Sequence, residues 1–284
     1  MERRHFLLGA SALGLTACAY PERELLDEFA DGSIPLQPGA PRTTTTTTTT
    51  TQSTDAAAET TAPEETLALE DELPVDIPDA DRPGLAFVAE AVVPLVAVSS
   101  NPALDDTVHE FANPIASGGP LVFLVEQLPD LNRMEVLLPT RPNGSFGWID
   151  GNDIRLTRHN YAIEVRLDEF LLTVFERELP IFQTTVGVAR ENAPTPLGRY
   201  YTTELLRPPE PDSVYGAFAY GLSGFSDTFQ TFAGGEGQLG IHGTNDPDSI
   251  GTNVSSGCIR MHNDDITQMV EAIGLPVGVP VDVI

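Results

Sequence analysis

GIHGTNDPDSIGTNVSSGCIRMHNDDI, residues 240–266, places one cysteine, Cys258, sixteen residues after a histidine, His242. The residues around this cysteine are mainly Gly, Ser, Thr, Asn and Asp, which favour turns, so we expect a long irregular loop. A cysteine attacks a carbonyl carbon as the thiolate, and a thiol with an ordinary pKa of about 8.5 is mostly protonated at neutral pH. The segment therefore predicts a nucleophile, Cys258, with His242 as its general base.

The residues next to Cys258 suit the same chemistry. Gly257 lets backbone amides approach a tetrahedral oxyanion, and Ser255 can donate or orient alongside them. Arg260 can hold a carboxylate with its planar guanidinium. A zinc site built from His242, Cys258 and His262 is the weaker interpretation, because there is no second cysteine and no ligand pair at metal-site spacing. The residues therefore favour a thiol nucleophile over a zinc site.

The N-terminus, MERRHFLLGASALGLTACAY, indicates export. Arg3 to Leu7 resemble the twin-arginine signal, and the apolar stretch that follows is too short to span a bilayer. Leu15 to Cys18 resemble the bacterial lipobox, in which Cys18 becomes the lipidated first residue of the mature chain. An ordinary secretory signal is the alternative. We expect residues 1–18 to be a lipoprotein signal and the mature protein to be anchored at the outer face of the cytoplasmic membrane.

Lipidation of Cys18 leaves Cys258 as the single remaining cysteine of the chain. A leftover cysteine in an exported protein forms an intermolecular bridge or is a reactive thiol. A buried cysteine that acts as a small hydrophobe is the other alternative. The small polar residues before Cys258 favour the reactive thiol.

Composition limits the partners. The 284 residues carry a formal net charge of −27, and all fifteen basic residues are arginine. Such acidity argues against binding to nucleic acid or to an anionic membrane surface. Residues 19–82, which include nine consecutive threonines from Thr43, are too polar and acidic to form a core, so we expect a disordered tether. The sequence does not predict an oligomeric state.

Residues 83–158 predict a small all-β module, because short apolar runs alternate there with turn signals. Its closing segment, LLPTRPNGSFGWIDGNDIRL, resembles the last strands of small bacterial SH3-like barrels. We expect Trp148, the only tryptophan, to belong to the core of this module.

Residues 159–284 predict a second β-rich domain. Residues 161–168 alternate between apolar and polar side chains, the period of a half-buried strand. Further strands are expected at 170–175, at 180–188, after Gly198 and at 277–284. One helix is expected after the catalytic loop, capped by Asn263 or Asp264 and ended by Gly274. The whole chain is thus predicted to be mainly β.

The motifs IHGTN, SIG and VSSGCIRMHNDD resemble the signature of L,D-transpeptidases with the YkuD-type catalytic domain. The resemblance covers about residues 161–284 and implies a β-sandwich catalytic domain. It implies that Cys258 is acylated, that His242 activates it and that Gly243, or its neighbour, orients the imidazole through a main-chain carbonyl. Ser255 and Gly257 would frame the oxyanion site, and Arg260 would contact substrate. Ser256 departs from the family pattern, since many members have a second histidine there.

The resemblance implies a cysteine acyltransferase of cell-wall biogenesis that acts on peptidoglycan stem peptides. Such an enzyme attacks the bond before the terminal D-alanine of a tetrapeptide stem and releases D-alanine. A side-chain amine of a neighbouring stem then resolves the thioester to give a 3→3 cross-link. The resemblance implies neither a metal nor an organic cofactor. Two alternatives stay open, a carboxypeptidase or hydrolase on the same scaffold and a non-catalytic wall-binding lipoprotein.

Overall fold

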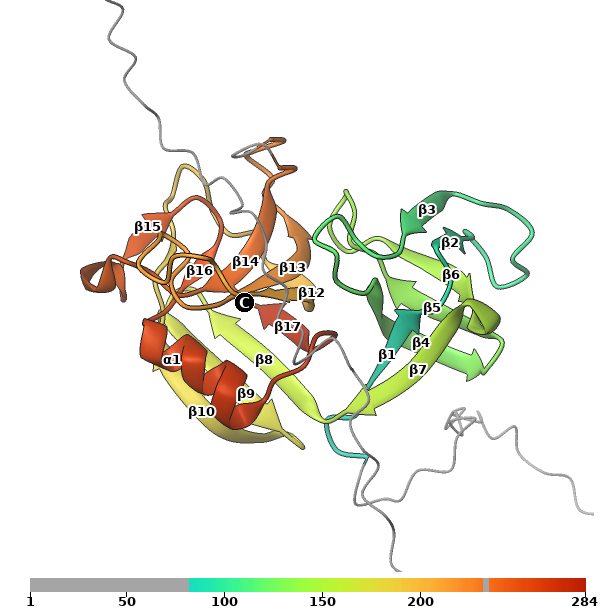
Figure 1. The fold of residues 1–284 in the computed structure, drawn as a ribbon, viewed down its shortest axis with the longest axis horizontal. Helices are drawn as coiled ribbons and strands as arrows, with labels where there is room; N and C mark the ends of the chain where they lie inside the picture. Colours follow the sequence, from blue (N-terminus) through green and yellow to red (C-terminus); the bar gives the residue numbers. More distant parts are fainter. Residues whose placement is uncertain (1–81, 232–234) are drawn as a thin grey trace, which may run out of the picture. The chain divides into compact units, whose positions relative to one another are not determined.

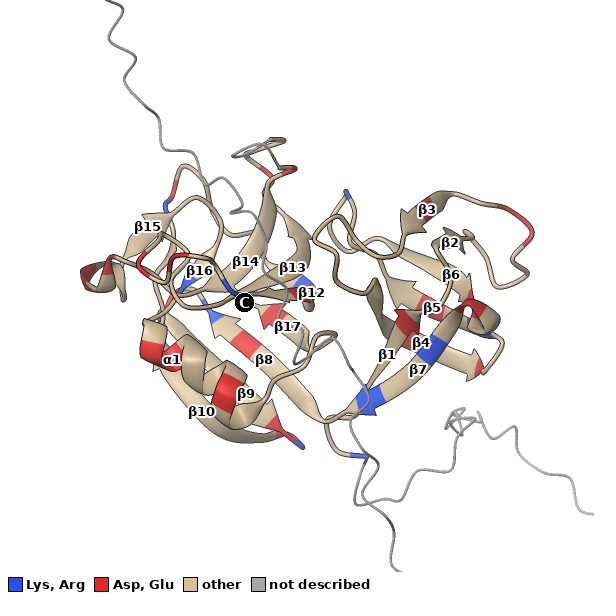
Figure 2. Ribbon diagram, viewed as in Figure 1, with Lys and Arg blue, Asp and Glu red and all other residues tan. Residues whose placement is uncertain are grey.

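The computed structural model describes residues 82–231 and 235–284, which form a mainly β structure (Figure 1). The predicted fold class is therefore confirmed. The predicted signal, with Cys18, and nearly all of the predicted tether lie outside the described residues. In the described part of the chain, no helix has both the length and the apolar character needed to cross a membrane. Acidic side chains are spread over many strands and loops, as Figure 2 shows.

The N-terminal sheet has five strands in the order β6-β5-β4-β1-β7. Its strands are β1 (Ala86–Ala91), β4 (Val122–Asp130), β5 (Arg133–Leu137), β6 (Phe146–Asp150) and β7 (Ile154–His159). A separate hairpin, β2 (Leu95–Val98) and β3 (His109–Ala112), lies between β1 and β4 in sequence. The buried side chains of this part form their own apolar cluster around Phe123, Val136 and Ile149. The SH3-like assignment stays a prediction.

Trp148 does not occupy the predicted core position. Side chains alternate along a strand, and on β6 the buried residues are Gly147 and Ile149, so the half-buried indole of Trp148 points to the other face. Its backbone pairs with Ser99, in both directions, at 2.8 and 2.9 Å. Gly147 is needed because a methyl group there would come within 2.3 Å of Val98.

The second sheet has eight strands in the order β10-β9-β8-β17-β12-β13-β14-β16. Its strands are β8 (Tyr161–Arg166), β9 (Leu171–Glu176), β10 (Leu179–Thr185), β12 (Gly198–Leu206), β13 (Ala219–Phe225), β14 (Gln238–His242), β16 (Ile259–Arg260) and β17 (Pro280–Val283). A two-stranded sheet, β11 (Val188–Ala189) with β15 (Asn253–Ser255), accompanies it. Most pairs are antiparallel, but β17 with β8 and β14 with β16 run parallel.

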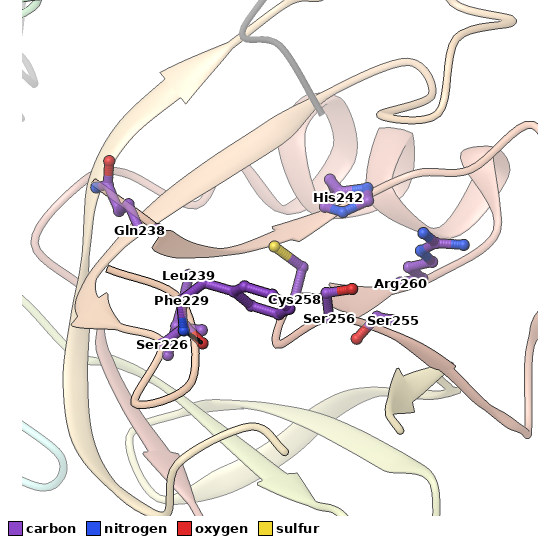
Figure 3. A pocket seen from close by; sticks show the side chains of 10 residues that line it. Ser226, Phe229, Gln238, Leu239, His242, Ser255, Ser256, Cys258 and Arg260 are labelled. Carbon is purple, nitrogen blue, oxygen red and sulfur yellow. Dashed lines mark hydrogen bonds between the residues drawn. The ribbon is translucent and has the colours of Figure 1, made fainter. Parts of the chain in front are cut away.

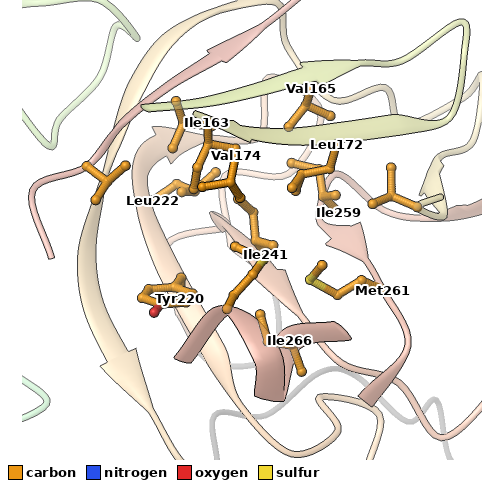
Figure 4. Close-up of a cluster of buried hydrophobic side chains, with 14 of the residues drawn as sticks. Ile163, Val165, Leu172, Val174, Tyr220, Leu222, Ile241, Ile259, Met261 and Ile266 are labelled. Carbon is orange, nitrogen blue, oxygen red and sulfur yellow. The ribbon is translucent and has the colours of Figure 1, made fainter. Parts of the chain in front are cut away.

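The core of this part lies between the sheet and the late helix. Figure 4 shows Ile163 and Val174 of the sheet above Ile266 of the helix, with Ile241 between them. Each of these four side chains is at most 1% exposed. Their burial fixes which face of β14 points inward, and therefore which face carries the chemistry.

The predicted helix is present but begins differently. α1 (Asn263–Thr267) is capped by His262 without a side-chain hydrogen bond, and a π-helical turn, Gln268–Ile273, continues it to Gly274. Asn263 does not cap the helix. Its Oδ1 instead accepts hydrogen bonds from the backbone N–H groups of Ala217 and Thr244, at 3.2 and 3.1 Å. The side chain thereby holds the segment that follows His242.

The prediction of one long irregular loop is wrong at both of its ends, where the chain forms strands. Its first residues, through His242, belong to β14, and Ile259–Arg260 form β16. Strand β13 was also missed. Both β13 and β14 contain interior glycines, which weaken the strand signal of a sequence. Tertiary pairing with neighbouring strands supplies what the local sequence lacks.

His159 is a buried histidine whose two nitrogens are both engaged. Its Nδ1 accepts a hydrogen bond from the backbone N–H of Tyr161 at 3.1 Å, so Nε2 carries the proton and donates to the carbonyl of Gly278 at 3.3 Å. A second proton would break the first contact. Burial lowers the pKa of His159 to about 4, against the weaker opposing effect of the Gly278 carbonyl.

We predict that His159 lowers the stability of the fold as the pH decreases. Its folded pKa of about 4 lies below the unfolded value of about 6.5, so between these values only the unfolded chain binds the proton. The free energy of unfolding therefore decreases as the pH drops through this window, by roughly 1 kcal/mol from pH 6 to pH 5 for each such histidine. His159→Gln should remove one such contribution, measured by urea unfolding at both pH values. An unchanged pH dependence would contradict the assignment.

Candidate active site

A pocket open to solvent gathers most of the residues that the sequence singled out. It contains about 410 Å³ of empty space and is lined by Ser226, Phe229, Gly237, Gln238, Leu239, His242, Ser255, Ser256, Cys258 and Arg260. Figure 3 shows His242, Cys258 and Arg260 grouped at one end and Gln238 at the other. Sequence analysis did not single out four of these lining residues, Ser226, Phe229, Gln238 and Leu239.

The parallel pairing of β14 with β16 brings the nucleophile to the base. Ile241 pairs with Ile259, and His242 pairs with Arg260. Cys258 is the residue before β16, so the register continued by one residue sets it beside Gly240, two residues from His242. Because paired residues point to the same face, the buried isoleucines turn His242, Arg260 and Cys258 outward, into the pocket.

His242 is 4% exposed and is held in one tautomer. Its Nδ1 lies 2.6 Å from the carbonyl oxygen of Gly243. A carbonyl only accepts, so Nδ1 carries the proton and Nε2 keeps the lone pair. The ring of Tyr215 meets the imidazole edge-on, with the two centroids 5.1 Å apart. These contacts orient a ring whose Nε2 can receive a proton.

The charge state of His242 suits a general base. Burial lowers its pKa to about 4, while the hydrogen bond to Gly243 raises it and the positive charge of Arg260 lowers it. The imidazole is therefore neutral at pH 7. A neutral imidazole can take the proton of a thiol, which a protonated one cannot.

The loop before Cys258 has a conformation that only glycine adopts readily. Gly257 has φ +130°, and a methyl group there would come within 2.9 Å of Leu239. Its N–H donates to the buried Oγ of Ser255 at 3.2 Å, and its carbonyl accepts from the Oγ1 of Thr195 at 2.8 Å. The Gly257 amide is thus engaged within the loop. In this structure Gly257 supplies the backbone conformation of the loop, and its place at the oxyanion stays a prediction.

Arg190 holds the same loop from the side. Its backbone N–H and its Nε both donate to the carbonyl of Ser255, at 3.1 and 3.2 Å. Its Nη2 donates to the Oγ of Ser256 at 2.7 Å. Ser256, the residue that departs from the expected family pattern, is thus a partner of Arg190. The sequence did not single out Arg190.

Arg260 presents an unused donor to the pocket. Its backbone exchanges two hydrogen bonds with Gly187, at 2.7 and 2.8 Å, which fix the residue. Its Nε is buried and has no hydrogen-bond partner among the described residues. A buried polar group without a partner is uncommon in folded proteins and calls for a ligand or a water molecule. A carboxylate matches a guanidinium best.

One wall of the pocket is supported by the N-terminal sheet. Nη2 of Arg141 donates to the carbonyls of Ser226 and Phe229, both at 3.0 Å. Its guanidinium lies 4.7 Å from the centroid of the Phe225 ring. Asn143 donates to the carbonyl of Phe225 at 2.8 Å and accepts from its N–H at 2.9 Å. The segment between β5 and β6 thereby holds residues that line the pocket.

The zinc interpretation gains no support from the geometry. Among the described residues, no group of three or more His, Cys, Asp or Glu side chains is arranged to hold a metal ion. His262, the third ligand of that interpretation, is exposed. The pocket instead brings together a thiol, a neutral imidazole and a guanidinium.

Comparison with known sequences supports a family for this domain. Residues 160–283 match the family model described as the L,D-transpeptidase catalytic domain, YkuD. The YkuD protein of Bacillus licheniformis, an L,D-transpeptidase by name, is 34% identical over 113 residues, which cover 40% of this chain and 60% of that protein. Its Bacillus subtilis namesake is 30% identical over 115 residues, with the same coverage. The chain thus spans about 60% of the length of these curated relatives.

Solved structures give weaker similarities. Bd1075 of Bdellovibrio bacteriovorus is 29% identical, with a TM-score of 0.35 over 44% of this chain and 47% of that one. An L,D-transpeptidase of Mycobacterium tuberculosis is 15% identical, with a TM-score of 0.38 over 58% of this chain and 90% of that one. The assignment of residues 160–283 to the L,D-transpeptidase catalytic domain family is supported by the sequence matches.

We predict that Arg260→Lys lowers turnover more than it lowers stability. Lysine keeps the charge but loses the bidentate geometry, and a charge-assisted hydrogen bond of roughly 1.5–3 kcal/mol corresponds to about a ten- to a hundredfold loss in kcat/KM. Stability should change little, because Nε has no partner within the described fold to lose. Kinetics and thermal melting test this, with Arg166→Lys, a surface ion-pair residue, as control. Equal losses of activity and stability would make Arg260 structural.

Proposed function

We propose that this chain is a peptidoglycan L,D-transpeptidase that forms 3→3 cross-links through a thioester on Cys258. One observation carries the proposal. The β14–β16 pairing places a neutral, buried histidine, a cysteine and a partly unsatisfied arginine in one pocket. The match of residues 160–283 to the L,D-transpeptidase catalytic domain gives this arrangement its substrate class.

The first half of the proposed reaction acylates the enzyme. Nε2 of His242 takes the proton of the Cys258 thiol, and the thiolate attacks the carbonyl carbon that precedes the terminal D-alanine of a tetrapeptide stem. The tetrahedral intermediate collapses to a thioester. The imidazolium returns its proton to the departing amine of D-alanine. Because burial disfavours the imidazolium, this proton is held only briefly.

The second half transfers the stem. The side-chain amine of a neighbouring stem attacks the thioester carbon, and His242 accepts the proton that this amine loses. Collapse of the intermediate forms the new amide and expels the Cys258 thiolate, which regains its proton from the imidazolium. Attack by water in place of the amine would make the same scaffold a hydrolase that trims the stem.

We predict that tetrapeptide muropeptides acylate the enzyme with loss of D-alanine and are then joined into dimers. Intact-mass analysis should place the adduct on the peptide that contains Cys258. Cys258→Ser should abolish it, because a serine hydroxyl is far harder to ionise than a thiol. His242→Ala should slow acylation strongly while leaving some reaction, since a fraction of the thiol ionises without a base.

The products of this incubation separate the three functions considered. Dimers support the transpeptidase, and trimmed tripeptides without dimers would identify a hydrolase. Unchanged stems together with an unmodified Cys258 would leave a non-catalytic wall-binding protein.

We also propose that the protein works outside the cytoplasm, held to the membrane by lipid on Cys18. The sequence around Cys18 is the support, because this residue lies outside the described part of the chain. A tether between anchor and catalytic domain would let the enzyme reach a wall substrate at a distance from the membrane.

We predict that Cys18→Ala shifts the protein from the membrane fraction to a soluble or unprocessed form, because the thioether that carries the lipid cannot form. Fractionation followed by mass measurement of the N-terminal peptide tests this, and Cys258→Ala serves as the matched control. A Cys18→Ala protein that stays processed and membrane-bound would refute the lipoprotein assignment.

A further inference from the structure

A buried carboxylate with an unused oxygen lies on the catalytic face of the sheet. Glu204, on β12, is only 8% exposed. Its Oε2 is buried and has no hydrogen-bond partner among the described residues. The arginines at the two ends of this strand pair elsewhere, Arg199 with Glu126 and Asp282, and Arg207 with Glu271. A charge buried without a partner is costly, so a functional reason is needed for it.

The strand register places Glu204 and Cys258 in one row across the sheet. Glu204 pairs with Gly221 on β13, and Gly221 pairs with Gly240 on β14. The pairing of Ile241 with Ile259, continued by one residue, sets Gly240 beside Cys258. Residues in such a row share one face of the sheet. The carboxylate and the nucleophile therefore face the same side, with two glycines between them.

The two glycines leave the row open. A methyl group on Gly240 would meet one backbone oxygen, that of Tyr220 at 3.0 Å, and no side chain within 4 Å. Over Gly221 lie the ends of two side chains. Oε1 of Glu204 is 3.0 Å, and Nε2 of Gln238 3.1 Å, from the position of a methyl group there. Glu204 thus reaches over the first glycine, and no side chain lies within 4 Å of a methyl group on the second, which is next to Cys258.

Gln238 connects this row with the described pocket. It lines the pocket with Cys258, and it lies on the same face of β14 as Gly240 and His242, since side chains alternate along a strand. Its Nε2 donates to the Oγ1 of Thr203 at 3.1 Å and to the carbonyl of Leu222 at 2.9 Å. The amide is therefore fixed beside Glu204, so Gln238 borders both the pocket and the carboxylate.

The distance between the carboxylate and Cys258 limits which amine the carboxylate can bind. Gly221 lies two strand spacings from Cys258, roughly 10 Å. An amine that attacks the thioester must come within about 3–3.5 Å of the carbonyl carbon, so the carboxylate is too far away to hold the attacking nitrogen. An amine at the end of a lysine-length side chain fits instead, if that side chain belongs to the residue acylated on Cys258.

We propose that Glu204 binds the side-chain ammonium of the donor stem's own third residue. The inference rests on the proposed function, because a 3→3 link joins two third residues, so the donor carries the same amine that the acceptor uses. Glu204 is then a specificity-determining residue. It selects stems whose third residue carries a free amine and aligns their carbonyl with the thiolate.

The test uses the full chain and two tetrapeptide stems that differ only in whether the side-chain amine of the third residue is free or acetylated. D-Alanine release and formation of the acyl-enzyme are measured over a range of stem concentrations. For the wild type, acetylation should raise KM about ten- to a hundredfold, the loss of one charge-assisted hydrogen bond. The kcat should change little, since the contact is present in ground and transition states alike.

Glu204→Gln keeps the shape of the side chain and removes its charge. This variant should raise KM for the free-amine stem by the same factor and should show no preference between the two stems. Glu271→Gln, a surface carboxylate on the last turn of the helix, should behave as the wild type. A β-lactam without an amine should acylate Cys258 at the same rate in the wild type and in Glu204→Gln.

Three results would overturn the inference. If the Glu204→Gln variant still prefers the free-amine stem, the carboxylate does not recognise the amine. Slower β-lactam acylation in Glu204→Gln would give Glu204 a structural role. If the acyl-enzyme forms normally in the variant but reacts slowly with the amine, Glu204 binds the acceptor stem and not the donor. If the wild type forms no acyl-enzyme with either stem, the proposed function itself fails, and this inference with it.

Discussion

The catalytic arrangement depends on the register of one short parallel pair, β14 with β16. Ile241 and Ile259 are both 0% exposed, and their burial turns His242 and Arg260 to the opposite face. A slip of one residue would turn the histidine into the apolar core and an isoleucine into the pocket. The two strands are joined by residues 243–258, and a parallel connection needs such a length. The parallel pairing of β11 with β15 and the contacts of Arg190 and Thr195 hold this connection in place.

Local pattern predicted the strands whose side chains alternate, such as β8, and it failed where glycine takes the place of the polar side chain in that alternation. Gly221 and Gly240 occupy positions of β13 and β14 that face the chemistry, so the feature that opens the catalytic face also erases the strand signal. The helix cap was misplaced for a related reason. Asn263 has the composition of a cap, but its Oδ1 is engaged by two backbone groups distant in sequence. Local sequence does not carry that information.

For the site, the sequence singled out three side chains that the fold brings together, and it missed the contacts that hold them. His242, Cys258 and Arg260 line one pocket. The tautomer of His242 follows only from the distance between Nδ1 and the Gly243 carbonyl. The engagement of the Gly257 amide by Ser255 and the place of Ser256 beside Arg190 likewise follow from geometry alone. These contacts need a folded chain, because their partners come from separate strands and turns.

The N-terminal sheet contributes to the catalytic pocket as well as covering its own core. Tyr201 of β12 is fully buried in a cluster with Val88 and Leu124 of that sheet, and its hydroxyl donates to the carbonyl of Val122 at 3.1 Å. Arg141 and Asn143 then hold the backbone at 225–229 that lines the pocket. A backbone carbonyl anchored by a guanidinium costs more to move than one that faces water. The pocket wall is therefore stiffer with the N-terminal sheet than it would be on the catalytic domain alone.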